Sequence, residues 1–455
     1  MRAVLTRAKD AWRALEALRG LYTQLLVNAV RQGTRLPPGN FGRAMFARFG
    51  DHRYYLDQFR RHGPLFRVVW SERLTVCVVG FKRAKQLFSL HARLLLPLTV
   101  NLEPFVPHGF IRGMSPDVHP KYRRIFLSAL DDRLLDIWEA DFRAKIRDEL
   151  GALAEMQASG QTAGAEALSR SLDRIAGRGL LMILYGLKPG HTALEQFEQA
   201  YERFGPAELE GNRLNAAQRA AFDDIRGLIR QAAAALTVNP DWGGGDGALP
   251  RILLADPSAV DETVIGNLAF MGAQGRYDLC GLLHWILKYL SGAPAVIADL
   301  RATIESGDRP TARARAEHVV LETLRLDQAE SLNRLVLEDF EFGGHHIPKG
   351  SFLRVLLRES HQDPGTFDEP AQFAPCRFAG RAYPSDAYAP FGVGEHRCLG
   401  GTIVVRLASI VIEELVAGFT WSVQGDGDRV FGRYHWEPSP TLSLILRVAP
   451  VEARR

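Results

Sequence analysis

The sequence predicts a mainly α-helical protein with small β-sheets. Helical periodicity of apolar residues runs through most segments between Asp51 and about Asp339, as in "HRYYLDQFRRHG", "KYRRIFLSALDDRLLDIWEADFRAKI" and "TVIGNLAFMGAQGRYDLCGLLHWILKYL". Strand-like runs are few and short. The chain has 455 residues with 46% apolar content, so it can bury a large core as one big domain or as two intimate ones.

The strand-like runs fall into two groups. The runs "LFRVVW" and "RLTVCVVG" predict a hairpin near the front of the chain, and "LVLEDFEFGGHHIPKGSFLRVLL" predicts a second one. The stretch "NPDWGGGDGALP", Asn239 to Pro250, contains a run of glycines. We expect it to form a mobile surface connection between two helices.

Charge and cysteine usage exclude several classes of protein. The chain has 56 basic and 52 acidic residues, a net charge of +4 that does not point to nucleic acid. The cysteines contain no CxxC pair, so they suggest neither a disulfide framework nor a zinc cluster. No run of 18 apolar residues and no signal peptide is present, so we expect a cytoplasmic protein. The four cysteines are Cys77, Cys280, Cys376 and Cys398.

Residues 1–36 form a separate predicted element, an amphipathic helix, and residues 37–455 form the main domain. The pattern fits a helix packed on its own domain, and it also fits a helix that lies on an anionic membrane surface through residues 1–35. Pro37 and Pro38 then make a stiff joint. The apolar residues recur at intervals of three or four: Leu5, Ala8, Trp12, Leu15, Leu18, Tyr22, Leu25 and Ala29. The basic residues lie mostly off that face: Arg2, Arg7, Lys9, Arg13, Arg19 and Arg31.

Cys398 stands alone in the glycine-rich stretch "PFGVGEHRCLGG". Apolar residues follow it at helical intervals as far as Gly418, a suitable helix cap, so Cys398 is predicted to lie at a helix amino terminus. There the helix macrodipole and unpaired N–H groups favour the thiolate. Gly392, Gly394 and Gly400 let the backbone fold tightly around the sulfur and let a flat group approach closely.

Three interpretations of this cysteine compete. A nucleophilic cysteine needs a nearby base, and His396 lies two residues away, but the sequence supplies no third, orienting group. A Walker-type phosphate cradle needs Gly-Lys-Ser/Thr, which is absent. The third interpretation is a thiolate ligand to haem iron, which favours O–O cleavage.

The stretch Phe391 to Gly400 resembles the haem-binding signature of the cytochrome P450 superfamily, Phe-x-x-Gly-x-x-x-Cys-x-Gly, in the form common in its soluble bacterial members. The resemblance runs from about Pro38 to the carboxyl end. It implies a large helical domain and a smaller β-rich domain around a buried haem b whose axial ligand is the Cys398 thiolate. It also implies that Phe391, Gly392, His396 and Gly400 contact the cofactor, with the histidine meeting a haem propionate.

Other motifs of the family stand at the matching places. Glu322 and Arg325 in "VVLETLRL" share one face of a predicted helix, and "FAPCRF" supplies Arg377. The resemblance implies that these three residues form a Glu-Arg-Arg network behind the haem. A buried charge of this kind needs such partners.

The resemblance also supplies cations for the two haem carboxylates. His119 and Arg123 in "DVHPKYRR" resemble the family's His-x-x-x-Arg helix, and Arg334 in "SLNRLVLEDF" falls where members place another arginine that binds a propionate. With His396 these make four cationic groups, which suit a dianionic cofactor whose buried carboxylates must be paired.

The pattern departs from the family on the distal side. Most members carry Ala-Gly-x-Asp/Glu-Thr on the long central helix, whereas this chain has Gln274, Gly275, Arg276, Tyr277 and Asp278 there. Dioxygen activation needs protons, so the departure concerns mechanism and not the cofactor. The proton source stays open: it could be Asp278, acting through water, or a hydroxyl group of the substrate. Hydrogen peroxide in place of O2 as the oxidant is a further alternative. The role of Arg276 is open as well. It could hold a fatty-acid carboxylate, as in peroxygenase members of the family, or it could form a charge pair with Asp278.

The resemblance implies a monooxygenase that inserts an oxygen atom from O2 into a hydrophobic small molecule. The substrate pocket is expected between the central helix and the region before His119, where Leu98, Phe105, Val106 and Phe110 suggest an apolar ligand. The alternatives are a peroxide-using peroxygenase or an O2-independent isomerase on the same fold, and a haem-binding sensor without turnover.

Electrons are expected from a separate partner, a ferredoxin with its reductase or a similar donor, because the haem domain uses up the length of the chain. An acidic ferredoxin would approach the cysteine side, where Lys121, Arg124 and Arg397 supply positive charge. We expect a monomer. Peripheral contact with a membrane through residues 1–35 stays open as an alternative to a purely cytoplasmic protein.

Overall fold

Most of the main domain is described by the computed structural model. The predicted amphipathic helix over residues 1–36 lies outside the described residues except at a few positions. The described residues are 12, 16, 19–20, 35–40, 46–47, 51–70, 73–160, 164–205, 213–327, 331–431 and 436–449.

The chain divides into two units. The first comprises Met1–Thr99, Ala329–Ala371 and Tyr383–Arg397, and the second comprises Val100–Gln328, Gln372–Ala382 and Cys398–Arg455. Each unit therefore draws on distant parts of the sequence, and the Pro390–Gly401 stretch contributes to both.

The first unit contains the predicted hairpins. β1 and β2 pair antiparallel from Leu65↔Val78 to Trp70↔Arg73, which confirms the front hairpin. The second predicted hairpin is present as β5 and β6, and the strands on either side of it, β4 and β7, pair antiparallel as well. The five-stranded sheet has the order β1-β2-β7-β4-β3, in which only β2 and β7 pair parallel. The strands are β1 (Leu65–Trp70), β2 (Arg73–Val78), β3 (Leu95–Pro97), β4 (Leu332–Val336), β5 (Phe340–Phe342), β6 (His345–Ile347) and β7 (Phe352–Val355).

Short helices accompany this sheet. Buried residues of the strands pack with Phe81, Ala84 and Leu87 of α3 and with Ala389 and Val393 of the segment that leads to Cys398. The core of the first unit thus includes the beginning of the cysteine loop. The helices are α2 (Tyr54–His62), α3 (Phe81–His91), η2 (Ala92–Leu94) and α13 (Leu357–Ser360).

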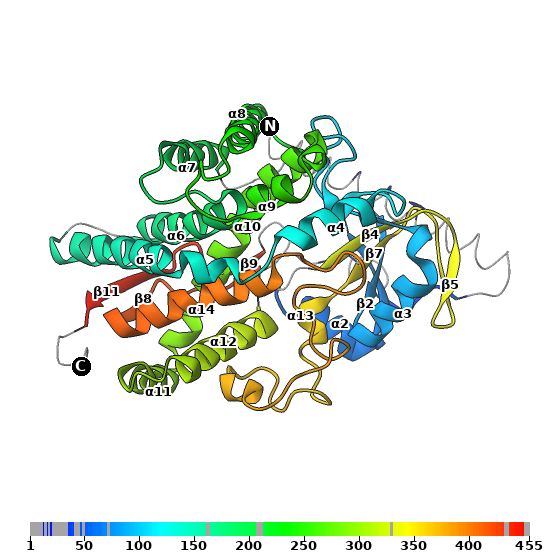
Figure 1. The fold of residues 1–455 in the computed structure, drawn as a ribbon. Helices are drawn as coiled ribbons and strands as arrows, with labels where there is room; N and C mark the ends of the chain where they lie inside the picture. Colours follow the sequence, from blue (N-terminus) through cyan, green and yellow to red (C-terminus); the bar gives the residue numbers. More distant parts are fainter. Residues whose placement is uncertain are drawn as a thin grey trace, which may run out of the picture. The chain divides into compact units, whose positions relative to one another are not determined.

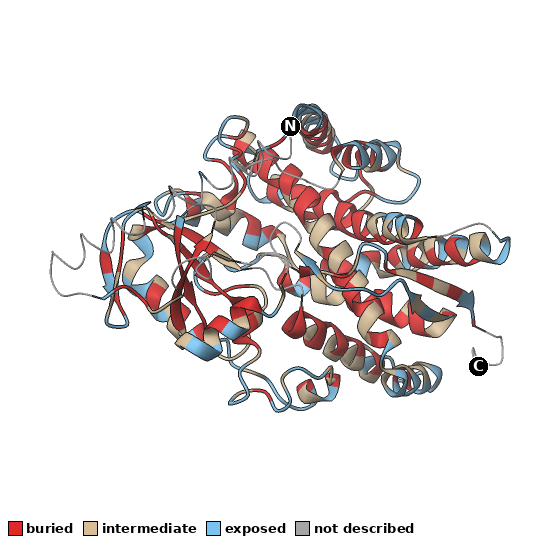
Figure 2. Ribbon diagram, turned by 180° about the vertical axis from the view of Figure 1, so that it is seen from behind, coloured by how far each residue is buried: buried red, intermediate tan, exposed pale blue. Residues whose placement is uncertain are grey.

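The second unit is predominantly helical, so the predicted fold class is confirmed. α6 and α14 both pack against α5 (Figure 1). Figure 2 shows buried residues along one side of most helices and exposed residues along the other, as expected for amphipathic helices around a core. The helices are η3 (Ile111–Gly113), α4 (His119–Ala129), α5 (Leu134–Ala158), α6 (Ala165–Tyr185), α7 (Thr192–Phe204), α8 (Ala216–Val238), α9 (Ala248–Ala255), η4 (Pro257–Ala259), α10 (Glu262–Ser291), α11 (Pro294–Glu305), α12 (Arg309–Leu326), η5 (Pro375–Phe378) and α14 (Gly401–Gly418). The strands are β8 (Phe419–Gln424), β9 (Val430–Phe431), β10 (Trp436–Glu437) and β11 (Ser443–Val448).

α10 is the central helix, with 30 residues. Asp261 caps it by accepting hydrogen bonds from the N–H groups of Thr263 and Val264, at 3.0 and 2.9 Å. Most of its first half is buried in the main core of the unit. Gly266 permits a close approach there, because a Cβ at this position would lie 2.4 Å from the side chain of Val106.

An ion-pair network joins α5, α12 and α14. Arg143 of α5 pairs with Glu413 and Glu414 of α14, and its distance to Glu414 is 2.7 Å. Arg313 of α12 pairs with Glu413 at 2.6 Å and with Glu139 of α5 at 2.9 Å. Because these side chains are largely shielded from water, the network fixes how α14 is rotated between its two neighbours.

The glycine-rich connection between α8 and α9 is not a mobile linker. Leu187 and Gly244 form an isolated antiparallel bridge, and Trp138 donates from Nε1 to the carbonyl oxygen of Asp246 at 2.9 Å. A Cβ on Gly245 would lie 2.1 Å from the Trp138 ring. The prediction of a mobile connection is therefore wrong: the glycines let this segment pack closely on α5 and on the end of α6.

Within the part of the chain that the structure describes, no single helix has the length and apolar character to span a membrane. α10 and α11 meet that test only as a pair, and they are bent by 102° at their junction.

Candidate functional site

Cys398 lies in the turn that precedes α14. The helix begins at Gly401 with Gly400 as its N-cap, so Cys398 stands two residues before the cap, and the helix starts slightly later than predicted. Gly418 is its last residue, and Phe419 is the C-cap. Leu399 packs against the main core of the second unit, which anchors the residue next to the cysteine. The unpaired N–H groups and positive dipole end of an 18-residue helix thus follow the sulfur directly.

The four cysteines differ in their surroundings. Burial raises the pKa of the Cys77 thiol to about 12, and burial also raises the pKa of Cys280 well above its usual range. These two thiols stay protonated at neutral pH. Cys376 and Cys398 are exposed. Cys376 lies within the short η5 helix, and only Cys398 of this exposed pair is followed by a long helix.

The segment before Cys398 belongs to the first unit and makes two tight turns. The N–H of Gly392 donates to the carbonyl of Ala389 at 3.1 Å, and the N–H of Arg397 donates to the carbonyl of Gly394 at 3.2 Å. Both glycines have positive φ, 83° and 75°, a conformation that strongly favours glycine. Gly392 is buried, whereas Phe391 and His396 are half-buried.

The structure brings Glu322, Arg325 and Arg377 together. The Glu322 carboxylate accepts from Arg325 at 2.7 and 2.9 Å and from Arg377 Nε at 3.0 Å. It also accepts from the N–H of Ala374 at 2.8 Å, and Arg325 donates to the carbonyl of Gln372 at 3.1 Å. Glu322 and Arg325 are completely buried. The charges compensate one another, and the cluster ties α12 to the segment around η5.

α4 presents the two predicted cofactor contacts of the second unit. His119 is its first residue and is buried, and Arg123, four residues later on the same face, is half-buried. Tyr122 donates to the carboxylate of Asp261 at 2.8 Å, which ties α4 to the start of α10. Lys121 and Arg124 are exposed on this helix, and Lys121 pairs with Asp261 at 3.9 Å.

Arg334 lies on β4 of the first unit and is 5% exposed. Its guanidinium lies 4.9 Å from the ring centroid of Phe88 and donates to the carbonyl of Asn333 at 3.0 Å. An arginine this deeply buried is held in one orientation by the ring and the backbone.

The four predicted distal residues of α10 do not form one cluster. Gln274 donates from Nε2 to the Asp278 carboxylate at 2.9 Å, so these two residues share one face of the helix. Arg276 pairs with Asp173 of α6 at 2.9 Å. The proposed pairing of Arg276 with Asp278 is therefore wrong, because two residues apart on a helix project to nearly opposite sides. The hydroxyl of Tyr277 donates to the carboxylate of Glu437 on β10.

Arg276 faces a polar pocket of about 260 Å³ between α5, α6, α7 and α10. The pocket is lined by charged side chains that pair among themselves, such as Arg178 with Glu198 at 2.6 Å. Burial raises the pKa of Asp173, although Arg276 acts in the opposite direction. The guanidinium of Arg276 is thus committed to α6.

The expected substrate region partly coincides with the core. Val106 and Phe110 are buried with α10, Phe105 packs against the same core, and the Phe110 ring lies 4.8 Å from that of Phe270. Sequence reasoning missed Asn267, which accepts from the N–H of Ile111 at 2.8 Å and donates to the carbonyl of Gly109 at 3.1 Å. A lone amide in the apolar run "TVIGNLAFMG" was the signal for it. Leu98 belongs to the first unit.

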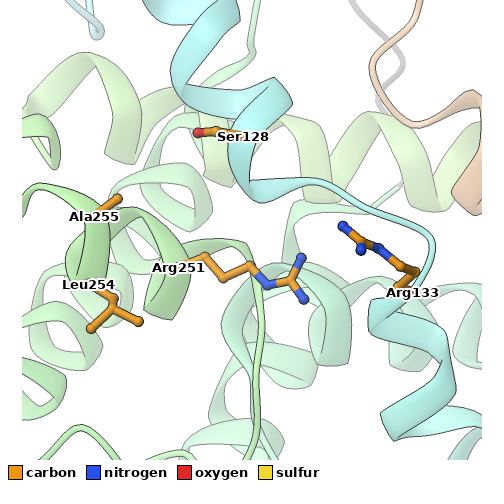
Figure 3. A pocket seen from close by; sticks show the side chains of 5 residues that line it. All are labelled: Ser128, Arg133, Arg251, Leu254 and Ala255. Carbon is orange, nitrogen blue, oxygen red and sulfur yellow. The ribbon is translucent and has the colours of Figure 1, made fainter.

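A second, open pocket of about 470 Å³ contains none of the predicted site residues. Figure 3 shows Arg133 and Arg251 directed toward the same space, with Ser128 and the end of α9 around it. Each arginine already pairs with a carboxylate, Arg133 with Asp131 and Arg251 with Asp246. We assign no ligand to this pocket.

The donor set fits a haem better than a bare metal ion. Among the residues that the structure describes, no group of three or more His, Cys, Asp or Glu side chains is arranged to hold a metal. A metal at Cys398 must therefore bring its other ligands, as the iron of a porphyrin does with four nitrogens and one protein thiolate. A Cβ on Gly400 would meet nothing within 4 Å, so no neighbouring atom crowds this residue of the turn.

The comparisons with known proteins agree with this geometry. The cytochrome P450 family model matches residues 282–433. Abscisic acid 8'-hydroxylase 2 of Oryza sativa subsp. indica is 23% identical and the alignment covers 92% of this chain and 87% of the relative. Abscisic acid 8'-hydroxylase 1 of Arabidopsis thaliana is 26% identical over 87% of this chain and 86% of the relative. The structure of retinoic acid bound cyanobacterial CYP120A1 shares the fold, with a TM-score of 0.69 and 19% identity over 91% of this chain and 100% of that chain. The chain therefore belongs to the cytochrome P450 superfamily of haem-thiolate monooxygenases.

Proposed function

We propose that this monooxygenase inserts one oxygen atom of O2 into a hydrophobic small molecule, with electrons from a separate protein and with Cys398 as the haem ligand. The observation that carries the proposal is the exposed Cys398 thiol directly before α14. The helix end stabilises the thiolate, and the glycine turns let a porphyrin approach it. When bound, a thiolate-ligated haem supplies O–O bond cleavage.

The haem carboxylates would be held by His119, Arg123, Arg334 and His396. Arg334 is preorganised by Phe88 and its own backbone contact, and His119 is fixed at the start of α4. Phe391, Gly392 and Gly400 would contact the ring. The buried Glu322 network stiffens the segment around η5.

Proton supply is assigned to the carboxylate of Asp278. Gln274 holds it through the 2.9 Å hydrogen bond, so its position relative to α10 is defined. An acid held in this way can pass a proton to a water molecule within hydrogen-bond reach. Tyr277 and Arg276 are directed to Glu437 and Asp173 instead. An arginine paired with Asp173 gives little support to a peroxygenase that holds a fatty-acid carboxylate there.

The apolar character of the substrate is supported by Val106, Phe110 and Phe270, which contribute aliphatic and aromatic surface beside α10. The relatives named as abscisic acid 8'-hydroxylases act on a small organic molecule, which supports a small-molecule substrate. The electron donor would be an acidic protein, such as a ferredoxin, that recognises exposed cations including Lys121, Arg124 and Arg397.

Peripheral membrane contact through residues 1–35 belongs to the proposal as well, with residues 37–455 as the haem domain. Liposome flotation of the full chain and of a chain lacking residues 1–35 tests it. We expect only the full chain to float, and equal behaviour of the two would contradict the membrane contact.

The central test compares Cys398→Ser with Cys376→Ser, a matched loss of an exposed thiol in the same unit. We expect Cys398→Ser to abolish the strongly red-shifted ferrous carbonyl band and Cys376→Ser to keep it. Retention of the band in Cys398→Ser would refute the ligand assignment.

A second experiment identifies the oxidant. The purified protein is screened with apolar metabolites for a change of haem spin state, and the ligands found are supplied either with ferredoxin, reductase and NADPH or with peroxide alone. Product from the electron-transfer chain is expected. Product with peroxide alone would replace the monooxygenase proposal by a peroxygenase.

A further inference from the structure

A buried imidazole of the first unit contacts the segment that leads to Cys398. His361 directly follows α13 and is completely buried. Its Nε2 accepts a hydrogen bond from the backbone N–H of Ala389 at 3.2 Å. Because a backbone N–H can only donate, Nε2 must be unprotonated, and the neutral ring carries its proton on Nδ1. Ala389 directly precedes the Pro390–Cys398 stretch, so this hydrogen bond holds the backbone where the cysteine loop begins.

Aromatic rings fix the orientation of this imidazole. Its centroid lies 4.8 Å from the ring of Phe81, the first residue of α3, and 5.1 Å from that of Tyr388. Phe367 approaches edge-on at 6.3 Å. A ring packed on several sides cannot turn away without opening the core, so its Nε2 is a preorganised acceptor.

Ala389 uses both polar groups of its backbone. Its N–H donates to His361, and its carbonyl accepts from the N–H of Gly392 at 3.1 Å to close the first turn of the loop. Val393 then enters the same apolar core as Ala389. The direction of the loop therefore depends on how the peptide plane before Ala389 is held.

We propose that His361 is a positioning residue for the haem-binding loop. By accepting the Ala389 N–H it sets the course of residues 390–397 and thereby the place where Cys398 is presented. The inference rests on the proposed role of Cys398 as the haem ligand. Replacing the imidazole by an apolar ring leaves a buried N–H without its acceptor, which favours rearranged loops.

The test uses two variants at one site. His361→Phe keeps an aromatic ring but removes the acceptor, whereas His361→Gln places an amide oxygen near the position of Nε2. His91→Phe is the matched control, because His91 is another imidazole of this unit and stacks on Phe340 at 4.2 Å. The readouts are the thiolate fraction of the ferrous carbonyl spectrum, the rate of haem transfer to apomyoglobin, and the unfolding temperature by circular dichroism.

We expect His361→Phe to lose at least half of the red-shifted band to a blue-shifted one and to release haem about tenfold faster, the equivalent of one buried hydrogen bond. His361→Gln should regain most of the band, and His91→Phe should match the wild type in both readouts. A wild-type spectrum in His361→Phe, or a Gln variant no better than the Phe variant, would overturn the proposal.

Hydrogen exchange on the wild-type holoenzyme keeps the test decisive if His361→Phe does not fold. The amide of Ala389 should exchange at least a hundredfold more slowly than an unprotected amide. Rapid exchange would overturn the positioning role. Failure of the underlying function is recognised separately, because Cys398→Ser would then keep its red-shifted band.

Discussion

Replacing Glu322 by glutamine removes the charge with which the buried Arg325 and the half-buried Arg377 pair. The carboxylate accepts four hydrogen bonds at 2.7 to 3.0 Å, three from guanidinium groups and one from the N–H of Ala374. The amide has one oxygen to accept with, and its NH2 group faces guanidinium donors. Arg325 remains completely buried and loses its counter-charge. Breaking one partner of a buried ion pair costs about 3–5 kcal/mol.

Urea denaturation measures this cost. At about 2–3 kcal/mol per molar urea, the midpoint of Glu322→Gln should fall by roughly 1–2.5 M. Glu166→Gln is the control, because Glu166 pairs with Arg170 at 2.6 Å on a helix surface where the two side chains are 84% and 59% exposed. That pair is worth about 0.3–0.5 kcal/mol. Equal midpoints for the two variants would refute the argument that burial makes the Glu322 cluster necessary.

Three further predictions concern other parts of the second unit. Gly245→Ala should destabilise the protein by about 1–3 kcal/mol, because its Cβ would lie 2.1 Å from Trp138. Gly151→Ala is the control: its Cβ would meet nothing within 4 Å inside α5, so this variant should be neutral or more stable by up to about 1 kcal/mol. Thermal unfolding measures both variants. Hydrogen bonds from two arginines lower the pKa of Glu262 to about 2 from its ordinary 4.5. Its stabilisation is therefore complete above pH 4.5 and lost as pH falls toward 2, so the urea midpoints of wild type and Glu262→Gln should converge over that interval. Asp278→Asn should slow NADPH-dependent product formation by about a hundredfold while peroxide release rises.

Each of these has a contrary outcome. A stable Gly245→Ala protein would mean that the glycine-rich connection can move off α5. If the urea midpoints of wild type and Glu262→Gln differ by the same amount at pH 7 and at pH 3, the charge of Glu262 is not the source of the stabilisation. Wild-type coupling of NADPH to product in Asp278→Asn would assign proton supply to another group.

The sequence predicted those features whose signal is local. The periodicity of α10, the front hairpin and the cysteine signature each lie within a few tens of residues, and the mainly helical fold is confirmed. The contacts that it did not predict join separate structural elements: Tyr277 of α10 with Glu437 of β10, 160 residues away, and His361 with Ala389, outside any shared helix or hairpin. No pattern within either segment specifies its partner, because such pairs are selected by packing of the whole unit.

The glycine-rich connection between α8 and α9 also could not be predicted from its local sequence. A run of glycines is compatible with a mobile linker and with a segment that must pass close to other atoms. The choice depends on the neighbours, and here Trp138 and the end of α6 occupy the space beside Gly245 and Gly247.

The ion-pair network of α5, α12 and α14 has a consequence for evolution. Glu413 is shared between Arg143 and Arg313, so losing any one of the three leaves unbalanced charge in a shielded place. Single replacements there should be selected against, and descendants should instead exchange the charges in concert or lose them together. In an alignment of relatives, positions 143, 313 and 413 are thus expected to covary although they are 100 to 270 residues apart in the chain.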